Sequence, residues 1–125
     1  MTDGPLDSPG ACIEELSAIN HEIAEFGHTW AELSGRLKKY DRQYSRLYQE
    51  AMRTVDGKNA EERQAIAHAA VAKVAPDLPP DIEYLEGQVE ELRTRFRSLE
   101  RRASIVQSVL AAMREEGKIA NFVHG

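Results

Sequence analysis

Residues 19–51 read INHEIAEFGHTWAELSGRLKKYDRQYSRLYQEA, and their apolar side chains recur in alternating steps of four and three residues. The series consists of Ile19, Ile23, Phe26, Trp30, Leu33, Leu37, Tyr40, Tyr44, Leu47 and Ala51. A heptad pattern sustained over four repeats predicts one long α-helix that packs along its length against a partner helix.

A second stretch, residues 82–113, repeats the same spacing. Its apolar residues are Ile82, Leu85, Val89, Leu92, Phe96, Leu99, Ala103, Val106, Leu110 and Met113. Two such helices in one chain predict an all-α fold, a long antiparallel helical hairpin that resembles a coiled coil. We expect four aromatic side chains to be buried between its arms: Trp30, Tyr40, Tyr44 and Phe96.

Capping and turn residues mark the ends of the predicted helices. Ser8 and Pro9 suit the N-cap and first position of the first helix, which should end near Val55. Gly57 suits the position after that helix, where a residue commonly adopts a left-handed backbone conformation. Asn59 then predicts the N-cap of a shorter alanine-rich helix, with two acids in its first turn.

The sequence PDLPPD, residues 76–81, interrupts the second arm because Pro76, Pro79 and Pro80 cannot continue a helix. The last helix should begin at Pro80 or Asp81 and end at Gly117. These boundaries predict a disordered tail over residues 1–9, a single helical hairpin domain over residues 10–117, and a flexible tail over residues 118–125.

The composition narrows the function classes. The chain has 125 residues, 6% aromatic residues and a single cysteine, Cys12, so an internal disulfide or a cysteine metal cluster is excluded. No apolar run reaches the length of about 18 residues that a membrane span needs. The acidic N-terminus resembles neither a signal nor a transit peptide. We therefore expect a cytoplasmic protein that does not enter membranes.

The sequence offers little to support catalysis. His21 and His28 are seven residues apart on a predicted solvent face, without the i,i+3 or i,i+4 partners of a helical metal site. No phosphate-binding loop, dinucleotide fingerprint or calcium loop is present. Adjacent glutamates such as Glu14 and Glu15 do not converge on one helix face. We expect a non-enzymatic protein with no cofactor and no metal.

Charge is arranged in blocks, although the formal net charge is −5. Residues 1–35 and 77–91 are acidic and contain no Lys or Arg. Residues 36–53 form a first basic block, and residues 93–102 form a second. The candidate contacts to a partner or to nucleic acid in these basic blocks are Arg36, Lys38, Lys39, Arg42, Arg46, Arg93, Arg97 and Arg101.

The two arms of the hairpin can be aligned in two ways, and each alignment predicts a different role for the basic blocks. In one, both basic blocks lie side by side and form a phosphate track. In the other, which charge complementarity favours, the second block pairs with the acidic residues 14–25, and Arg101 is the expected donor of the ion pair. The first block then stays available to a partner.

Some apolar residues fall outside both heptad series. Tyr48, Met52, Ile105 and Val109 would form an exposed patch of the kind that marks an interface. We expect this candidate oligomer interface to be covered by a second copy of the chain or by another protein.

Residues 57–63, with the pattern Gly-x-Asn-Ala-Glu-Glu-Arg, and the helix over residues 99–114 resemble short helical proteins encoded by phages of Gram-positive bacteria. The genes of that group often lie near single-strand annealing recombinases and single-strand binding proteins. The resemblance, which covers about residues 40–116, implies a phage source and this genetic neighbourhood. It implies no catalytic residues.

The leading hypothesis is a helical accessory protein that binds another protein, of phage or host origin, in phage DNA recombination or replication. One alternative is direct nucleic-acid binding through the two basic blocks. Another is an inhibitor of a host enzyme or defence complex, whose acidic residues 1–35 imitate the charge of nucleic acid. In each case we expect the protein in the cytoplasm of the host cell.

Overall fold

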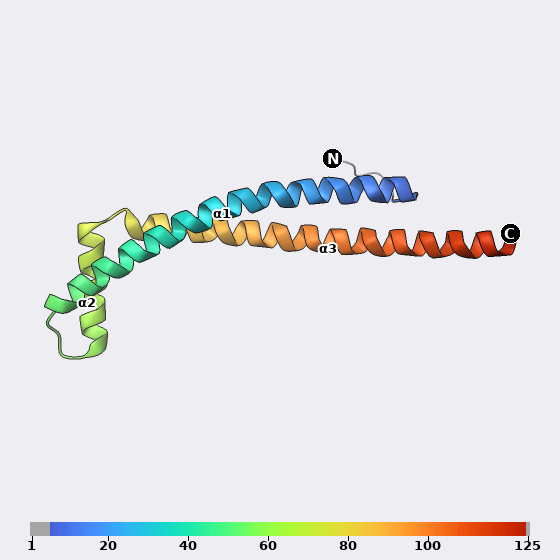
Figure 1. Cartoon of the computed structure of the whole chain (residues 1–125). Helices are drawn as coiled ribbons and strands as arrows, with labels where there is room; N and C mark the ends of the chain where they lie inside the picture. Colours follow the sequence, from blue (N-terminus) through green and yellow to red (C-terminus); the bar gives the residue numbers. More distant parts are fainter. Residues whose placement is uncertain (1–5, 125) are drawn as a thin grey trace. The chain divides into compact units, whose positions relative to one another are not determined.

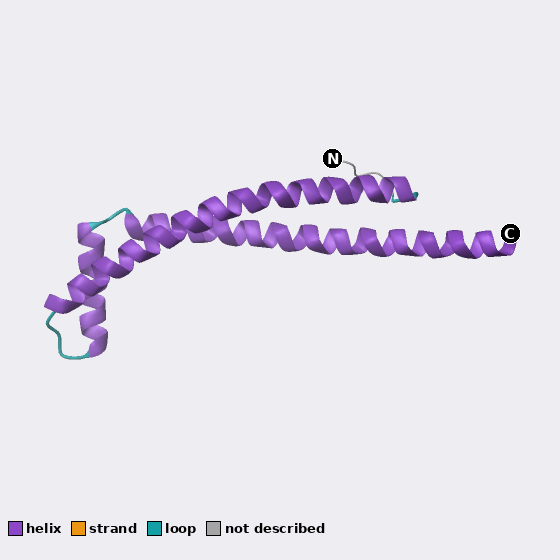
Figure 2. Ribbon diagram, viewed as in Figure 1, coloured by secondary structure: helices purple, strands orange, loops and turns teal. Residues whose placement is uncertain are grey.

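Three α-helices make up most of the chain (Figure 2). The computed structural model describes residues 6–124, with side chains as far as residue 117. The helices are α1 (Pro9–Thr54), α2 (Ala60–Val74) and α3 (Leu78–His124). No strand occurs between residues 6 and 124, and the predicted all-α class is confirmed. No helix in that range is both long and apolar enough to cross a membrane.

The first helix begins as its capping residues predict. The hydroxyl Oγ of Ser8 accepts a hydrogen bond from the backbone N–H of Ala11 at 3.1 Å, and the carbonyl of Ser8 accepts one from Cys12 at 3.1 Å. Pro9 occupies the first helical position, where its missing N–H leaves no bond unmade. Residues 1–5 of the predicted disordered tail lie outside the described residues.

The loop after α1 uses Gly57 differently from the prediction. Gly57 has no positive φ, so the predicted left-handed cap is wrong. A Cβ added at Gly57 would lie 2.9 Å from Cγ and 3.2 Å from the backbone N of Arg63. Nη1 of Arg63 also donates to the carbonyl of Gly57 at 3.4 Å. Glycine is therefore needed here for a close approach of the loop to the first turn of α2.

The N-cap predicted for α2 is confirmed. The side-chain Oδ1 of Asn59 accepts a hydrogen bond from the backbone N–H of Glu62 at 2.8 Å. The carboxylate of Glu62 in turn accepts from the backbone N–H of Lys58 at 3.1 Å. The two bonds satisfy two backbone donors and fix the start of the helix; they resemble a capping box, except that the second donor is Lys58, one residue before the cap.

The third helix begins earlier than the prolines suggest. It starts at Leu78, not at Pro80 or Asp81, and the carbonyl of Asp77 accepts from the backbone N–H of Asp81 at 3.0 Å. Pro79 and Pro80 fit inside the first turn because the first four N–H groups of a helix have no intrahelical partner. PDLPPD therefore separates α2 from α3, but four of its six residues belong to α3.

The end of α3 also differs from the prediction. The helix continues through Gly117 to His124, so Gly117 does not end it, and the residues predicted as a flexible tail are helical to His124. Gly117 has no positive φ, and a Cβ added there would meet no other described side chain within 4 Å. A glycine inside a helix costs only about 1 kcal/mol relative to alanine, which helix-forming neighbours can offset.

The chain divides into two compact units. Unit 1 consists of residues 1–29 and 92–125, and unit 2 of residues 30–91. In unit 1 the N-terminal part of α1 and the C-terminal part of α3 run side by side in opposite directions (Figure 1). Its core contains Cys12, Ile19, Val106 and Leu110, and Leu6 packs against that core.

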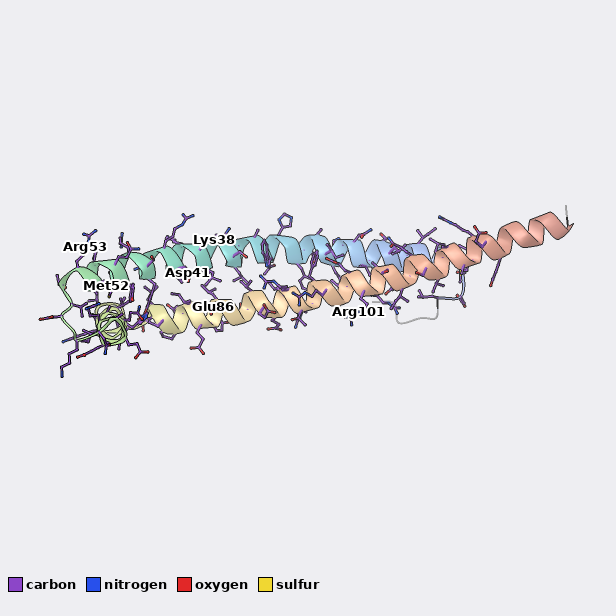
Figure 3. The ribbon with its side chains drawn as sticks, turned by 90° about the horizontal axis from the view of Figure 1, so that it is seen from below. Lys38, Asp41, Met52, Arg53, Glu86 and Arg101 are labelled. Carbon is purple, nitrogen blue, oxygen red and sulfur yellow. The ribbon has the colours of Figure 1, made fainter. Side chains whose placement is uncertain are left out.

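Unit 2 contains the rest of α1, all of α2 and the first part of α3. Within it, α2 crosses the end of α1 steeply, so that Figure 3 shows α2 almost end-on. Its buried side chains are Ala67, Val71, Leu78, Leu85 and Val89. Ala67 and Val71 are one turn apart, and these small side chains let the crossing helices approach closely.

The two heptad series predict the inward faces well, with one exception. Every residue of both series is buried or half-buried except Trp30, which is 44% exposed. The predicted burial of Trp30 is therefore wrong, whereas Tyr40, Tyr44 and Phe96 are half-buried. Trp30 is the first residue of unit 2, and an indole is too large to be covered fully by a thin helical layer. The hairpin over the whole chain stays a prediction.

Candidate functional site

The first basic block lies on one face of α1 in unit 2. Lys38, Lys39, Arg42 and Arg46 are all exposed, and they line one groove together with Gly35 and Gln43. Their spacing of three and four residues places them on adjoining turns of the helix. We call this surface the cationic groove. Lys38 lies on the side of α1 that faces away from α3 (Figure 3).

The members of this block differ in how they are paired. Nη2 of Arg36 lies 3.4 Å from Oε1 of Glu32, one turn earlier on the same helix. The four cations of the groove form no hydrogen bond or ion pair with the part of the chain that the structure describes. Arg36 is therefore partly neutralised, and the groove keeps its positive charge.

The second basic block belongs to unit 1, where it meets the acidic start of α1. Nε of Arg102 lies 3.2 Å from Oε1 of Glu15. The donor is Arg102 and not Arg101, so the predicted donor is wrong by one residue. Neighbouring residues of a helix are rotated by about 100° from one another. Arg102 therefore lies beside the line of contact between the two helices, and Arg101 lies farther toward the outer side of α3. Arg93, Arg97 and Arg101 are exposed.

This ion pair agrees with the alignment that sets the second block against the acids of residues 14–25. The two basic blocks do not form one track within a single unit, because residues 36–46 belong to unit 2 and residues 93–102 to unit 1.

A groove in unit 1 lies beside this ion pair. It is lined by Glu15, Ala18, Ile19, Glu22, Ser98, Leu99 and Arg102. Ile105 and Val109 continue the row of Ser98 and Arg102 along α3, in steps of three and four residues. Ile105 is 50% exposed, whereas Val109 is half-buried and packs against the core of unit 1. We call this surface the Ile105 face.

The four residues of the candidate oligomer interface are not gathered in one unit. Ile105 and Val109 are in unit 1, while Tyr48 and Met52 are in unit 2 and half-buried. The ring of Tyr48 lies against the ring of His68 on α2, with 4.6 Å between their centroids. Tyr48 therefore helps to hold α2 on α1, a role that the sequence analysis did not assign to it.

His68 on α2 contacts two tyrosines of α1, and the sequence alone did not single it out. Its Nδ1 lies 2.5 Å from the hydroxyl of Tyr44, and its ring stacks on that tyrosine as well. The two tyrosines are four residues apart on α1, so one histidine on α2 can contact both. A four-residue spacing of tyrosines is the only signal in the sequence, and it does not identify the helix that supplies the partner.

The other histidines lie on the surface. Nε2 of His21 is 3.2 Å from Oε1 of Glu25 on the next turn, and both side chains are largely exposed. His28 is exposed too. Among the described residues, no three His, Cys, Asp or Glu side chains are grouped closely enough to hold a metal ion.

Unit 2 also has an acidic groove, lined by Asp41, Tyr44, Pro79, Ile82, Glu83 and Glu86. Asp41 comes from α1 and Glu86 from α3 (Figure 3), and Glu83 precedes Glu86 by three residues on the same helix. Asp41 is the one acid within the first basic block, and its side chain lines a different groove from the four cations. The cationic groove is thus free of carboxylates along its walls.

Comparison with known proteins identified no relative of this chain. No protein-family model matches the chain, and no curated protein or solved structure matches it.

Proposed function

We propose that this protein is a non-enzymatic helical accessory protein that binds a helical segment of another protein on the Ile105 face. The observation that carries the proposal is the exposed Ile105 beside the groove of unit 1. A pair of helices can bury one stripe of each helix, and the flanks of the pair remain open. A third helix laid on one flank would convert the pair into a three-helix bundle.

The composition of the face supports a helical ligand. Ala18, Ile19 and Leu99 provide an apolar floor, and Glu15, Glu22 and Arg102 provide a charged rim. Protein interfaces commonly have an apolar centre and a polar rim of this kind. Amphipathic helices bind such grooves through apolar residues spaced three, four and seven apart. The short side chain of Ala18 leaves room for a close approach.

The proposed absence of catalysis is supported by the character of the buried groups. Among the described residues, none of the buried side chains is polar or charged. Catalytic groups are commonly desolvated and paired in clefts, and these grooves are shallow surfaces of helices. The resemblance of residues 57–63 and 99–114 to phage-encoded helical proteins directs the search for the partner to proteins of phage DNA recombination or replication.

Affinity capture with matched variants tests the proposal. The immobilised protein is incubated with a lysate of phage-infected Gram-positive cells, in parallel with Ile105→Glu and Ile13→Glu. Ile13 is 54% exposed and lies two residues before Glu15, about 200° around the helix and therefore on the opposite flank of unit 1. We expect a protein that the wild type and Ile13→Glu retain and that Ile105→Glu loses.

Two results would count against the proposal. One is the absence of any retained protein, and the other is equal retention by all three baits. Capture of a second copy of this chain, with the same dependence on Ile105, would assign the face to self-association and would support the predicted homo-oligomer in place of a separate partner.

A further inference from the structure

We propose that the cationic groove of α1 is a second interaction surface, which binds the phosphate backbone of nucleic acid without reading its sequence. This surface lies in unit 2, whereas the Ile105 face lies in unit 1, so the proposal does not rest on the protein partner. Its starting point is the gathering of Lys38, Lys39, Arg42 and Arg46 around one groove.

The four cations are available to a ligand. All are exposed, and none has an acidic partner within the described residues, in contrast to Arg36 and Arg102. A chain with a net charge of −5 contains enough acids to neutralise them, yet the acid of this segment, Asp41, lines another groove. Positive charge is thus concentrated on one face of an acidic protein, which favours a local polyanionic ligand.

The chemistry of the groove distinguishes a phosphate backbone from an acidic protein. Its other two lining residues are Gly35 and Gln43, so the surface contains no large apolar side chain. Protein interfaces bury an apolar centre and are depleted in lysine. Protein–DNA interfaces are polar and strongly positive, and most of their hydrogen bonds reach phosphate and sugar oxygens. The groove matches the second description.

Its spacing also matches a nucleic-acid strand. Lys38, Arg42 and Arg46 are each four residues apart, so successive charges advance by about 6 Å along the helix axis, at about 1.5 Å per residue. Two base pairs of duplex DNA advance by about 6.8 Å, at about 3.4 Å per pair. A helix that follows one strand can therefore set a cation against every second phosphate. Gly35 and Gln43 leave the groove open, and nothing lies within 4 Å of a Cβ added at Gly35.

Fluorescence anisotropy with labelled oligonucleotides tests the inference. The probes are a mixed-sequence 30-base-pair duplex, a single strand of thirty thymidines, and polyglutamate of similar charge. Binding is measured between about 50 and 200 mM salt. With four phosphate contacts, log K should fall against log salt with a slope of about −3.6 for the duplex and about −2.8 for the single strand. Binding that is absent at the lowest salt would overturn the proposal.

Two charge-matched variants assign the binding to the groove. Lys39→Glu/Arg42→Glu alters the groove, and Arg97→Glu/Arg101→Glu alters exposed arginines of the second block; each reverses two charges and takes the net charge from −5 to −9. We expect the first variant to lose at least tenfold in affinity and the second to lose less than threefold. Equal losses would contradict a local site, because they would reflect net charge alone.

Two further measurements separate the remaining explanations. Circular dichroism should show that both variants keep their helix content. If Lys39→Glu/Arg42→Glu unfolds, the neutral variant Lys39→Gln/Arg42→Gln should still lose affinity and lower the salt slope by about 2 units. Polyglutamate should bind more weakly than the oligonucleotides. If it binds as tightly, the groove is a site for acidic polypeptides and the proposal is wrong.

Discussion

A single ion pair distinguishes Arg102 from its neighbour Arg101. Arg102 contacts Glu15 from the other helix of unit 1, whereas Arg101 is exposed. Glu15 is much less exposed than Arg102, so its carboxylate is partly shielded from water. Partly shielded charges interact more strongly than fully solvated ones. This contact is the residue-level link between the acidic start of α1 and the second basic block.

Reversal of that charge should destabilise the protein measurably. Arg102→Glu sets two carboxylates against each other, and we expect the free energy of unfolding to fall by about 1 kcal/mol in low salt. Arg101→Glu carries the same charge change and should lower it by less than about 0.3 kcal/mol. Urea denaturation of both variants measures the difference. The loss should shrink at about 1 M salt because screening weakens the repulsion. Equal losses for the two variants would contradict this pairing.

At the scale of the helices, the core of unit 1 depends on a narrow stripe of α1. Ile19 is 3% exposed and belongs to the core cluster, whereas Ile13, on the same helix, is 54% exposed. The two isoleucines have the same chemistry, so their different surroundings alone determine what each contributes to stability.

Truncation of the two isoleucines should therefore give very different results. Ile19→Ala removes buried methyl groups and leaves a cavity, and we expect a loss of about 2–5 kcal/mol in the free energy of unfolding. Ile13→Ala should change it by less than about 0.5 kcal/mol. Thermal or urea denaturation, followed by the helical circular dichroism signal, makes the comparison. Similar losses at both positions would show that α1 packs against α3 through a different face from the one that contains Ile19.

The sequence predicts which residues face inward better than it predicts where helices begin and end. Heptad spacing depends on the geometry of the helix itself, so it identifies inward residues such as Ile19 and Val106 without knowledge of the partner. The effect of a proline or a glycine depends on its position in the helix. Pro79 and Pro80 are tolerated in a first turn, and Gly117 destabilises the helix too little to end it.

Contacts between helices are harder to predict because they depend on register. The pairing of Glu15 with Arg102, and of Tyr44 with His68, joins residues 87 and 24 positions apart. A shift of one residue changes the donor, as the difference between Arg101 and Arg102 shows. For the candidate sites, the sequence predicts the cationic residues of α1, but only the structure separates the four groove cations from Arg36 and splits the predicted apolar patch between two units.

At the scale of the whole molecule, each of the two units carries a different exposed surface. Unit 1 presents the Ile105 face, which is apolar with a charged rim, and unit 2 presents the cationic groove. The proposed protein partner and the proposed nucleic acid would therefore bind to different units of one chain. Both contacts are compatible with the proposed accessory role in DNA recombination or replication.

The claim that a partner helix lies on the Ile105 face is tested most directly by photo-cross-linking. A benzophenone amino acid is introduced at position 105 in one variant and at position 13 in another, and each is irradiated in the lysate of phage-infected cells. We predict a defined cross-linked product from position 105 and none from position 13. Absence of a product from position 105, or the same product from both positions, would contradict the account.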